Sequence, residues 1–126
     1  MKILKYILMS IISLIVINVW FFRFNNVTIY RGGNATNMIE EFAVYGLSET
    51  IVYIIGSMKI LAALGLLIGF VINKTIVPSA SLMATLMLGA IIMHFRVSDE
   101  AIKFLPAGVL FLCSLAVFYL HKKETL

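Results

Sequence analysis

The sequence has little charge and almost no cysteine, and each shortage excludes a class of protein. Only 13% of its 126 residues are charged and 62% are hydrophobic, whereas a soluble domain carries about 25% charged residues. A soluble globular protein is therefore excluded. The single cysteine, Cys113, excludes an intramolecular disulfide and every CxxC redox centre. It lies in an apolar run, where a small buried thiol is the ordinary role of cysteine.

Four apolar runs are each long enough to cross the hydrocarbon core of a bilayer as a helix, which takes about 20 residues. They cover residues 3–22, 50–72, 76–95 and 102–120. Because these runs use most of the chain, they predict one membrane domain over residues 1–126, an all-α antiparallel bundle of four transmembrane helices. The net charge of +4 does not indicate nucleic-acid binding, because the basic residues lie singly or in pairs at the ends of the runs.

The lysines at the ends of the runs predict how the helices are oriented. With an even number of spans, both termini and the second connection share one side of the membrane, and that side carries Lys2, Lys5, Lys74, Lys122 and Lys123. By the positive-inside rule it is the cytoplasmic side. We therefore expect both termini in the cytoplasm and the protein in the plasma membrane, which is the inner membrane of a bacterium. The first run lacks a cleavage pattern, which favours a retained signal anchor.

The only long connection, residues 23–49, lies on the outer side and is too long for a bare turn. Asn37 followed by Glu40 resembles a helix-capping arrangement. An apolar stripe follows, formed by Met38, Ile39, Phe42 and Ala43. Glu40 and Glu41 are expected to face elsewhere. The pattern predicts a short helix that lies at the membrane interface over the bundle and ends at Gly46.

The run over residues 50–72 is apolar for a full crossing except at Lys59, near its middle. A lysine at the centre of a spanning helix costs roughly 2.5 to 3.5 kcal/mol on insertion scales, which favours a position that faces other helices, water or a polar partner. The small residues Gly56, Ala62 and Ala63 share its helical face and let another backbone come close. We therefore expect Lys59 inside the bundle. The alternative is an amine that snorkels along a lipid-facing side.

Depth counting brings other polar residues to the level of Lys59. Its side chain leans toward the N-terminus of its helix, and hence toward the outer half of the membrane. Asn18 and His94 lie near the outer ends of the first and third runs and lean inward, so the three polar groups are expected to converge. Glu49 lies at the outer mouth as an acidic partner reached through water. The candidate ligand site is formed by Lys59, His94, Asn18, Gly56, Met87 and Glu49.

Two of these residues can have a structural role instead of binding a ligand, and the sequence shows no pattern typical of several common catalytic or metal sites. His94 can instead bond water or a backbone carbonyl at the interface, and Asn18 can serve as a polar contact between helices. His94 and His121 fall at opposite membrane faces, which excludes paired haem ligation. No spacing indicates a metal site, a phosphate-binding loop or a serine nucleophile with its base. We therefore assign no catalytic residue and no metal ligand.

Three stretches carry a resemblance to a known family: FAVYGL at residues 42–47, IGSMKILAALGLLIG at residues 55–69 and MLGAIIMH at residues 87–94. From Arg31 onward the chain resembles the DoxX-like family of small four-helix membrane proteins. The resemblance implies that fold. Some relatives are membrane subunits associated with quinone-linked sulfur oxidation or oxidative-stress enzymes, and a related animal protein is an assembly chaperone for a receptor. Many relatives carry an acidic residue at the place of Lys59.

The residues and the resemblance together lead to two main hypotheses. The first is a non-catalytic subunit or assembly partner with a pocket for a small lipid-like or quinone-like headgroup. The alternative is the membrane subunit of a quinone-linked oxidoreductase whose catalytic centre lies on a partner. A transporter is less favoured, because no repeat of broken helices occurs. Quinone is the only cofactor indicated, and the partners expected are the lipid bilayer, a membrane or redox protein, or a second copy of the chain.

Overall fold

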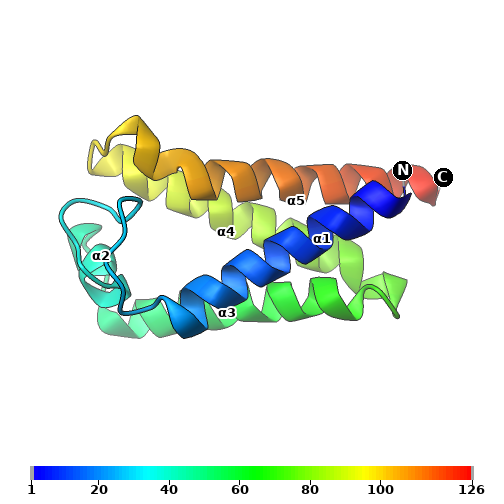
Figure 1. Cartoon of the computed structure of the whole chain (residues 1–126), viewed down its shortest axis with the longest axis horizontal. Coiled ribbons are helices and arrows are strands. Elements are labelled where there is room, and N and C mark those ends of the chain that lie inside the picture. Colours follow the sequence, from blue (N-terminus) through cyan, green and yellow to red (C-terminus); the bar gives the residue numbers. More distant parts are fainter. Residues whose placement is uncertain (1, 126) are drawn as a thin grey trace.

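Four long helices run along the molecule, and a short fifth helix lies at one of its ends (Figure 1). The computed structural model describes residues 2–125, and within them no strand occurs. The helices are α1 (Lys2–Ile17), which continues as a π-helical segment (Asn18–Phe22), α2 (Met38–Val44), α3 (Glu49–Ile68), α4 (Ile76–Arg96) and α5 (Leu105–Glu124). All four long ones are long and apolar enough to cross a membrane. This confirms the predicted all-α, four-helix membrane fold.

Two of the long helices end at other residues than the apolar runs suggest. α3 stops at Ile68, and the chain then turns before a 3-10 segment at Asn73–Thr75 leads into α4. α5 is preceded by a 3-10 segment at Ala101–Phe104 and continues to Glu124, beyond the apolar run. Lysines in the last turn of a helix interact favourably with its dipole. The basic residues near the end of the chain therefore belong to α5 and do not form a separate tail.

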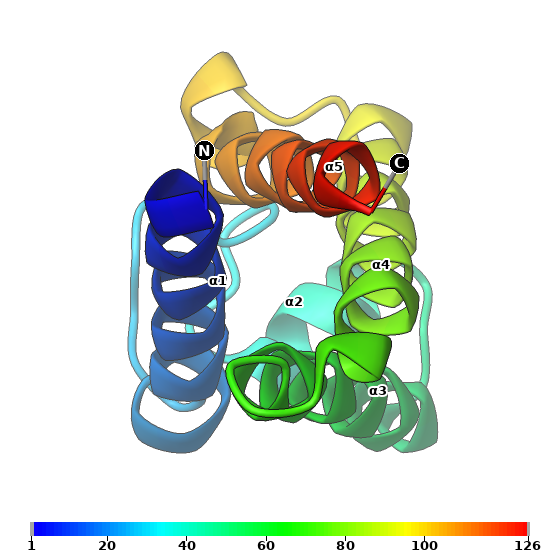
Figure 2. The ribbon, with the colours of Figure 1, turned by 90° about the vertical axis from the view of Figure 1, so that its right-hand side faces the viewer.

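The four long helices form a square when seen from the end of the bundle (Figure 2). α1 and α4 each pack against both α3 and α5. The start of α1, the end of α5 and the turn between α3 and α4 lie at one end, here termed the terminal end, and α2 lies at the opposite, loop end (Figure 1). Toward the loop end, the pair formed by α1 and α3 spreads away from the pair formed by α4 and α5 (Figure 1).

The terminal half of the bundle is packed tightly, because small residues let the helices approach each other. A Cβ atom on Gly65 would lie 1.9 Å from Oγ of Ser79 on α4. Ala62 and Ala63 are buried on the same side of α3, and the Ser13 hydroxyl of α1 donates a hydrogen bond of 3.0 Å to the Ala63 carbonyl. Close backbone approach at small residues is the usual way in which membrane helices pack.

An ion pair joins α1 to α5 at the terminal end. The Lys5 amine lies 2.5 Å from Oε2 of Glu124 and 3.2 Å from Nδ1 of His121. Only 2% of Lys5 is exposed. Lys5 therefore ties the two terminal helices together, in addition to marking the end of the first apolar run.

The short helix α2 forms as predicted at the loop end. Oδ1 of Asn37 accepts a hydrogen bond of 2.8 Å from the Glu40 amide, which caps the helix. Met38 and Phe42 are buried, and they pack with Val52 of α3 in one hydrophobic cluster. The helix stops before Gly46, which has a φ of 82° that favours glycine. Glu41 differs from the expectation, because it turns inward and only 13% of its side chain is exposed.

Candidate ligand cavity

A cavity of about 630 Å³ lies in the half of the bundle that is nearer the loop end. Residues from all four long helices, from α2 and from the outer loop line it, and most of them are apolar. Sites for small molecules usually measure about 300 to 1,000 Å³. The helices spread apart at this end, and the outer loop and α2 close the space only in part. The arrangement therefore leaves room for a ligand near the loop end.

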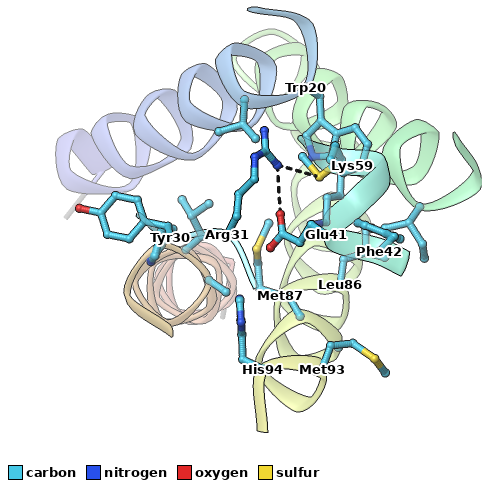
Figure 3. Close-up of a pocket in the computed structure, with 18 of the residues that line it drawn as sticks. Trp20, Tyr30, Arg31, Glu41, Phe42, Lys59, Leu86, Met87, Met93 and His94 are labelled. Carbon is cyan, nitrogen blue, oxygen red and sulfur yellow. Dashed lines mark hydrogen bonds and ion pairs between the residues drawn. The ribbon is translucent and has the colours of Figure 1, made fainter. Parts of the chain in front are cut away.

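Lys59 reaches this cavity from α3 and has one partner, the ring of Trp20 (Figure 3). Its amine lies 5.4 Å from the centre of that ring, which is a cation–π contact. Within residues 2–125 the amine makes no hydrogen bond and no ion pair. The charge therefore faces the cavity without an anionic neighbour bound to it.

Gly56 sets the position of Trp20. The glycine is buried one turn before Lys59 on α3, and a Cβ atom there would lie 2.5 Å from Cζ3 of Trp20. The indole can thus pack this closely against α3 only because position 56 has no side chain. Gly56 is itself absent from the cavity wall and shapes the site through Trp20.

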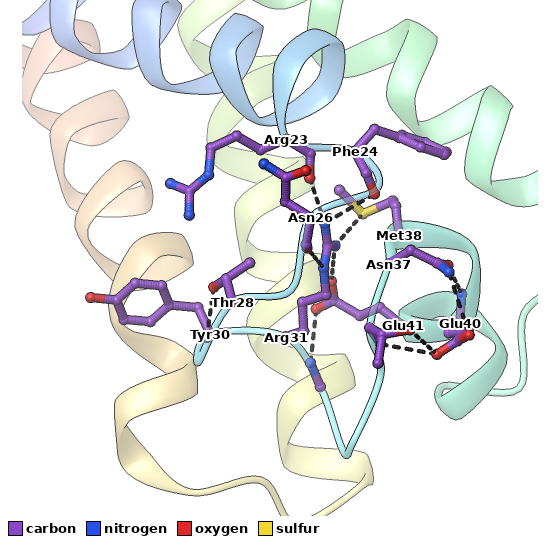
Figure 4. Close-up of polar contacts among 12 residues, drawn as sticks. Arg23, Phe24, Asn26, Thr28, Tyr30, Arg31, Asn37, Met38, Glu40 and Glu41 are labelled. Carbon is purple, nitrogen blue, oxygen red and sulfur yellow. Dashed lines mark hydrogen bonds and ion pairs between the residues drawn. The ribbon is translucent and has the colours of Figure 1, made fainter.

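Arg31 anchors the outer loop in the mouth of the bundle (Figure 4). Its guanidinium donates hydrogen bonds to Oε1 of Glu41 at 3.0 Å and to the carbonyls of Arg23 at 2.7 Å, Phe24 at 3.0 Å and Asn26 at 2.9 Å. Only 4% of Arg31 is exposed. A buried arginine that is fully bonded and paired with a carboxylate fixes the path of the chain around it. No local signal in the sequence pairs Arg31 with a carboxylate ten residues later.

A chain of polar contacts continues from Glu41 to Asp99. The Tyr45 hydroxyl donates a hydrogen bond of 2.7 Å to Oε2 of Glu41 and lies 3.4 Å from both ring nitrogens of His94. Nδ1 of His94 lies 2.6 Å from Oδ2 of Asp99. Oδ1 of Asp99 accepts a hydrogen bond of 2.9 Å from the Gly33 amide. These contacts bind the outer loop to the turn between α4 and α5.

The acid and base properties of two groups in this chain are shifted by their surroundings. Burial raises the pKa of Tyr45, and the charge and hydrogen bond of Glu41 raise it further, so the hydroxyl stays protonated and remains a donor. Burial also acts to raise the pKa of Asp99, but hydrogen bonds from His94 and Gly33 and the nearby positive charges outweigh it. The pKa of Asp99 therefore lies below its ordinary value, and the side chain is an anion at neutral pH.

The structure brings together three of the six residues that the sequence singled out as a candidate site. Lys59, Met87 and His94 line the cavity. Asn18 is exposed and does not line it. Glu49 is also exposed, and its Oε1 accepts a hydrogen bond of 3.3 Å from the Tyr53 hydroxyl.

The position of Asn18 differs from the convergence that depth counting predicted. That count assumed an α-helix to the end of the first run, whereas the chain is π-helical over Asn18–Phe22. In this segment Trp20, and not Asn18, lines the cavity and contacts Lys59.

Residues 14–117 match the sequence profile of the DoxX-like family. The match covers most of the chain. The protein belongs to the DoxX-like family. Together with the four apolar helices, this membership makes it an integral membrane protein. Neither a curated protein nor a solved structure matched the chain.

Two residues that line the cavity of this DoxX-like protein, Ile15 of α1 and Thr85 of α4, are also exposed. Gly89, one turn after Thr85, belongs to the same wall and has open space where a Cβ atom would lie.

Proposed function

We propose that this DoxX-like protein is a non-catalytic membrane subunit or assembly partner that binds a small lipid-like or quinone-like molecule in the cavity around Lys59 and His94. The observation that supports this proposal is an apolar cavity of about 630 Å³ with an amine on its wall whose only partner among residues 2–125 is the ring of Trp20. The apolar walls suit a ring or a chain. Lys59 offers a donor to its headgroup.

Two glycines provide a matched test of binding. A Cβ atom on Gly89 or on Gly108 would have no atom within 4 Å, but only Gly89 lines the cavity. Either change also replaces a glycine inside a helix, which favours the helix by up to about 1 kcal/mol. We expect Gly89→Leu to narrow the cavity and to abolish ligand binding, and Gly108→Leu to leave it intact.

The measurement is native mass spectrometry of protein released from a mild detergent. The wild-type protein and Gly108→Leu should carry the same small-molecule adduct, and Gly89→Leu should lack it. The mass of the adduct separates a lipid from a quinone, and a quinone together with a captured oxidoreductase is the result expected for the subunit of a quinone-linked enzyme. If the wild type carries no adduct and binds neither added lipid nor added quinone, the proposal is wrong.

We also infer that both termini face the cytoplasm of a cell in whose plasma membrane the protein lies. Support comes from Lys2, Lys74, Lys122 and Lys123, which lie at or next to the terminal end. In a Cys113→Ala background, Glu100→Cys should react with an impermeant maleimide in intact cells, and Lys74→Cys only after permeabilisation. The reverse labelling pattern would overturn this orientation.

A further inference from the structure

The positive and negative charges of the side chains on the cavity wall do not cancel. Four cationic residues line the cavity, namely Arg23, Arg31, Lys59 and Lys103, and the only carboxylate among the lining residues is that of Glu41. Asp99 lies nearby, but its two oxygens are engaged by His94 and by the Gly33 amide. The wall therefore carries an excess of positive charge within a mostly apolar lining.

Two of the four cations are already engaged by the protein. Arg31 is bound by Glu41 and by three carbonyl oxygens, and the Lys103 amine donates to the Gly33 carbonyl. The one carboxylate is also occupied, because Glu41 accepts hydrogen bonds from Arg31, Tyr45 and the Gly32 amide. The other two cations form no ion pair with any acidic group among residues 2–125.

Lys59 and Arg23 are those two cations, and they lie at different places on the wall. Arg23 is exposed at the end of the π-helical segment, where water can solvate it. Lys59 lies in the middle of α3, and the ring of Trp20 is the only partner of its amine among residues 2–125. A cation inside an apolar cavity is strongly favoured by an anionic partner that hydrogen-bonds to it. The ligand is the remaining source of such a partner.

We infer that the ligand is an amphiphile with an acidic headgroup on a single apolar chain, bound with the acid against Lys59 and the chain along the apolar wall. This inference rests on the proposed function, because it names the chemical class that the cavity takes. One water molecule takes up roughly 30 Å³ in the liquid, and a CH₂ group is of similar size. On that scale a cavity of about 630 Å³ holds on the order of twenty non-hydrogen atoms. One long-chain fatty acid fits that size, whereas a lipid with two such chains exceeds it.

Trp20 is the only tryptophan of the chain and provides a reporter inside the cavity, next to Lys59. The full-length protein in nonionic detergent is titrated with a brominated C18 fatty acid, because bromine quenches indole fluorescence on contact. The matched neutral probe is the brominated C18 alcohol. We expect saturable quenching by both probes, with the acid bound about tenfold or more tightly because it makes a charge-assisted hydrogen bond.

Three variants test the role of Lys59. Lys59→Met should remove the preference for the acid, and Lys59→Arg should keep it. Lys74→Met makes the same chemical change at the terminal end, where the side chain is exposed, and should behave like the wild type. Saturable binding of the alcohol by Lys59→Met shows that this variant is folded. If Lys59→Met does not fold, Lys59→Gln is tested in its place, and it should also lose the preference for the acid.

The outcomes separate this inference from the proposed function. Equal affinity of the wild type for acid and alcohol would overturn the acidic headgroup and leave the cavity as a site for neutral molecules. A preference for the acid that survives in Lys59→Met would also overturn it. Quenching that never saturates, and that is the same in Gly89→Leu, would overturn both proposals, because the probes then reach Trp20 only from the detergent.

Discussion

Replacing Lys59 by methionine should make the unliganded protein more stable. Lys59 is the only charged residue of α3 beyond its first residue, Glu49, and a lysine at this depth costs roughly 2.5 to 3.5 kcal/mol on insertion scales. The contact with Trp20 offsets part of this cost, by about 0.5 to 2 kcal/mol. Methionine has a similar length and fills the same space without the charge. The expected gain in the free energy of unfolding is therefore about 0.5 to 3 kcal/mol, from the difference of those two ranges.

The gain should lie toward the lower end of that range, because Lys59 faces a cavity and not the acyl chains. Water that enters the cavity solvates the ammonium and reduces the cost of its burial. The assay is unfolding by sodium dodecyl sulfate from mixed micelles, followed by the fluorescence of Trp20. Lys74→Met is the control, and its stability should stay within about 0.5 kcal/mol of the wild type, as for most surface substitutions.

An acidic ligand should reduce or reverse the difference between the wild type and Lys59→Met. A ligand at one hundred times its dissociation constant stabilises the folded state by about 2.7 kcal/mol, and only the wild type should bind the acid tightly. A clear loss of stability in Lys59→Met without ligand, with Lys74→Met unchanged, would refute the reasoning. In that case the protein itself would stabilise the ammonium by more than its burial costs.

Three further predictions concern the residues around the cavity. Gly56→Ala should lower stability and shift the emission of Trp20, because the new Cβ atom would lie 2.5 Å from the indole. This clash should outweigh the preference of the helix for alanine, which is about 1 kcal/mol. An unshifted emission would contradict this packing. The pKa of Asp99 is lowered in the folded protein. The ionised side chain therefore stabilises the fold at any pH above its pKa in the unfolded chain, which is about 3.9, and this stabilisation is lost as the pH falls through the pKa in the folded protein. Proteolysis of the loop over residues 23–48 should therefore accelerate below about pH 4 in the wild type, and Asp99→Asn should be cleaved faster than the wild type already at neutral pH. Equal cleavage rates of the two proteins at neutral pH would show that Asp99 does not hold the loop. Asn37→Ala should cost about 1 kcal/mol by loss of the cap and raise amide exchange in α2 but not in α4, and unchanged exchange in α2 would show that the cap is dispensable.

The sequence by itself determined the membrane fold and the short helix. The four spans follow from hydrophobic length, because the thickness of the bilayer sets how many apolar residues a helix needs. The start of α2 follows from Asn37, whose side chain satisfies an amide only a few residues away. Its end follows from Gly46, which tolerates a positive φ. These properties depend on neighbours along the chain, and a reading of residue order can therefore find them.

Only the tertiary structure decided which polar groups meet. The π-helical segment brings Trp20 to Lys59 and leaves Asn18 exposed, and hydrophobic periodicity carries no sign of the wider turn. Glu41 turns inward to Arg31 because the outer loop folds back into the mouth of the bundle. Likewise, His94 meets Asp99 only because the turn after α4 brings the carboxylate back beside its ring. Such contacts depend on the rotation of each helix and the path of each loop, which the packing of the whole chain sets.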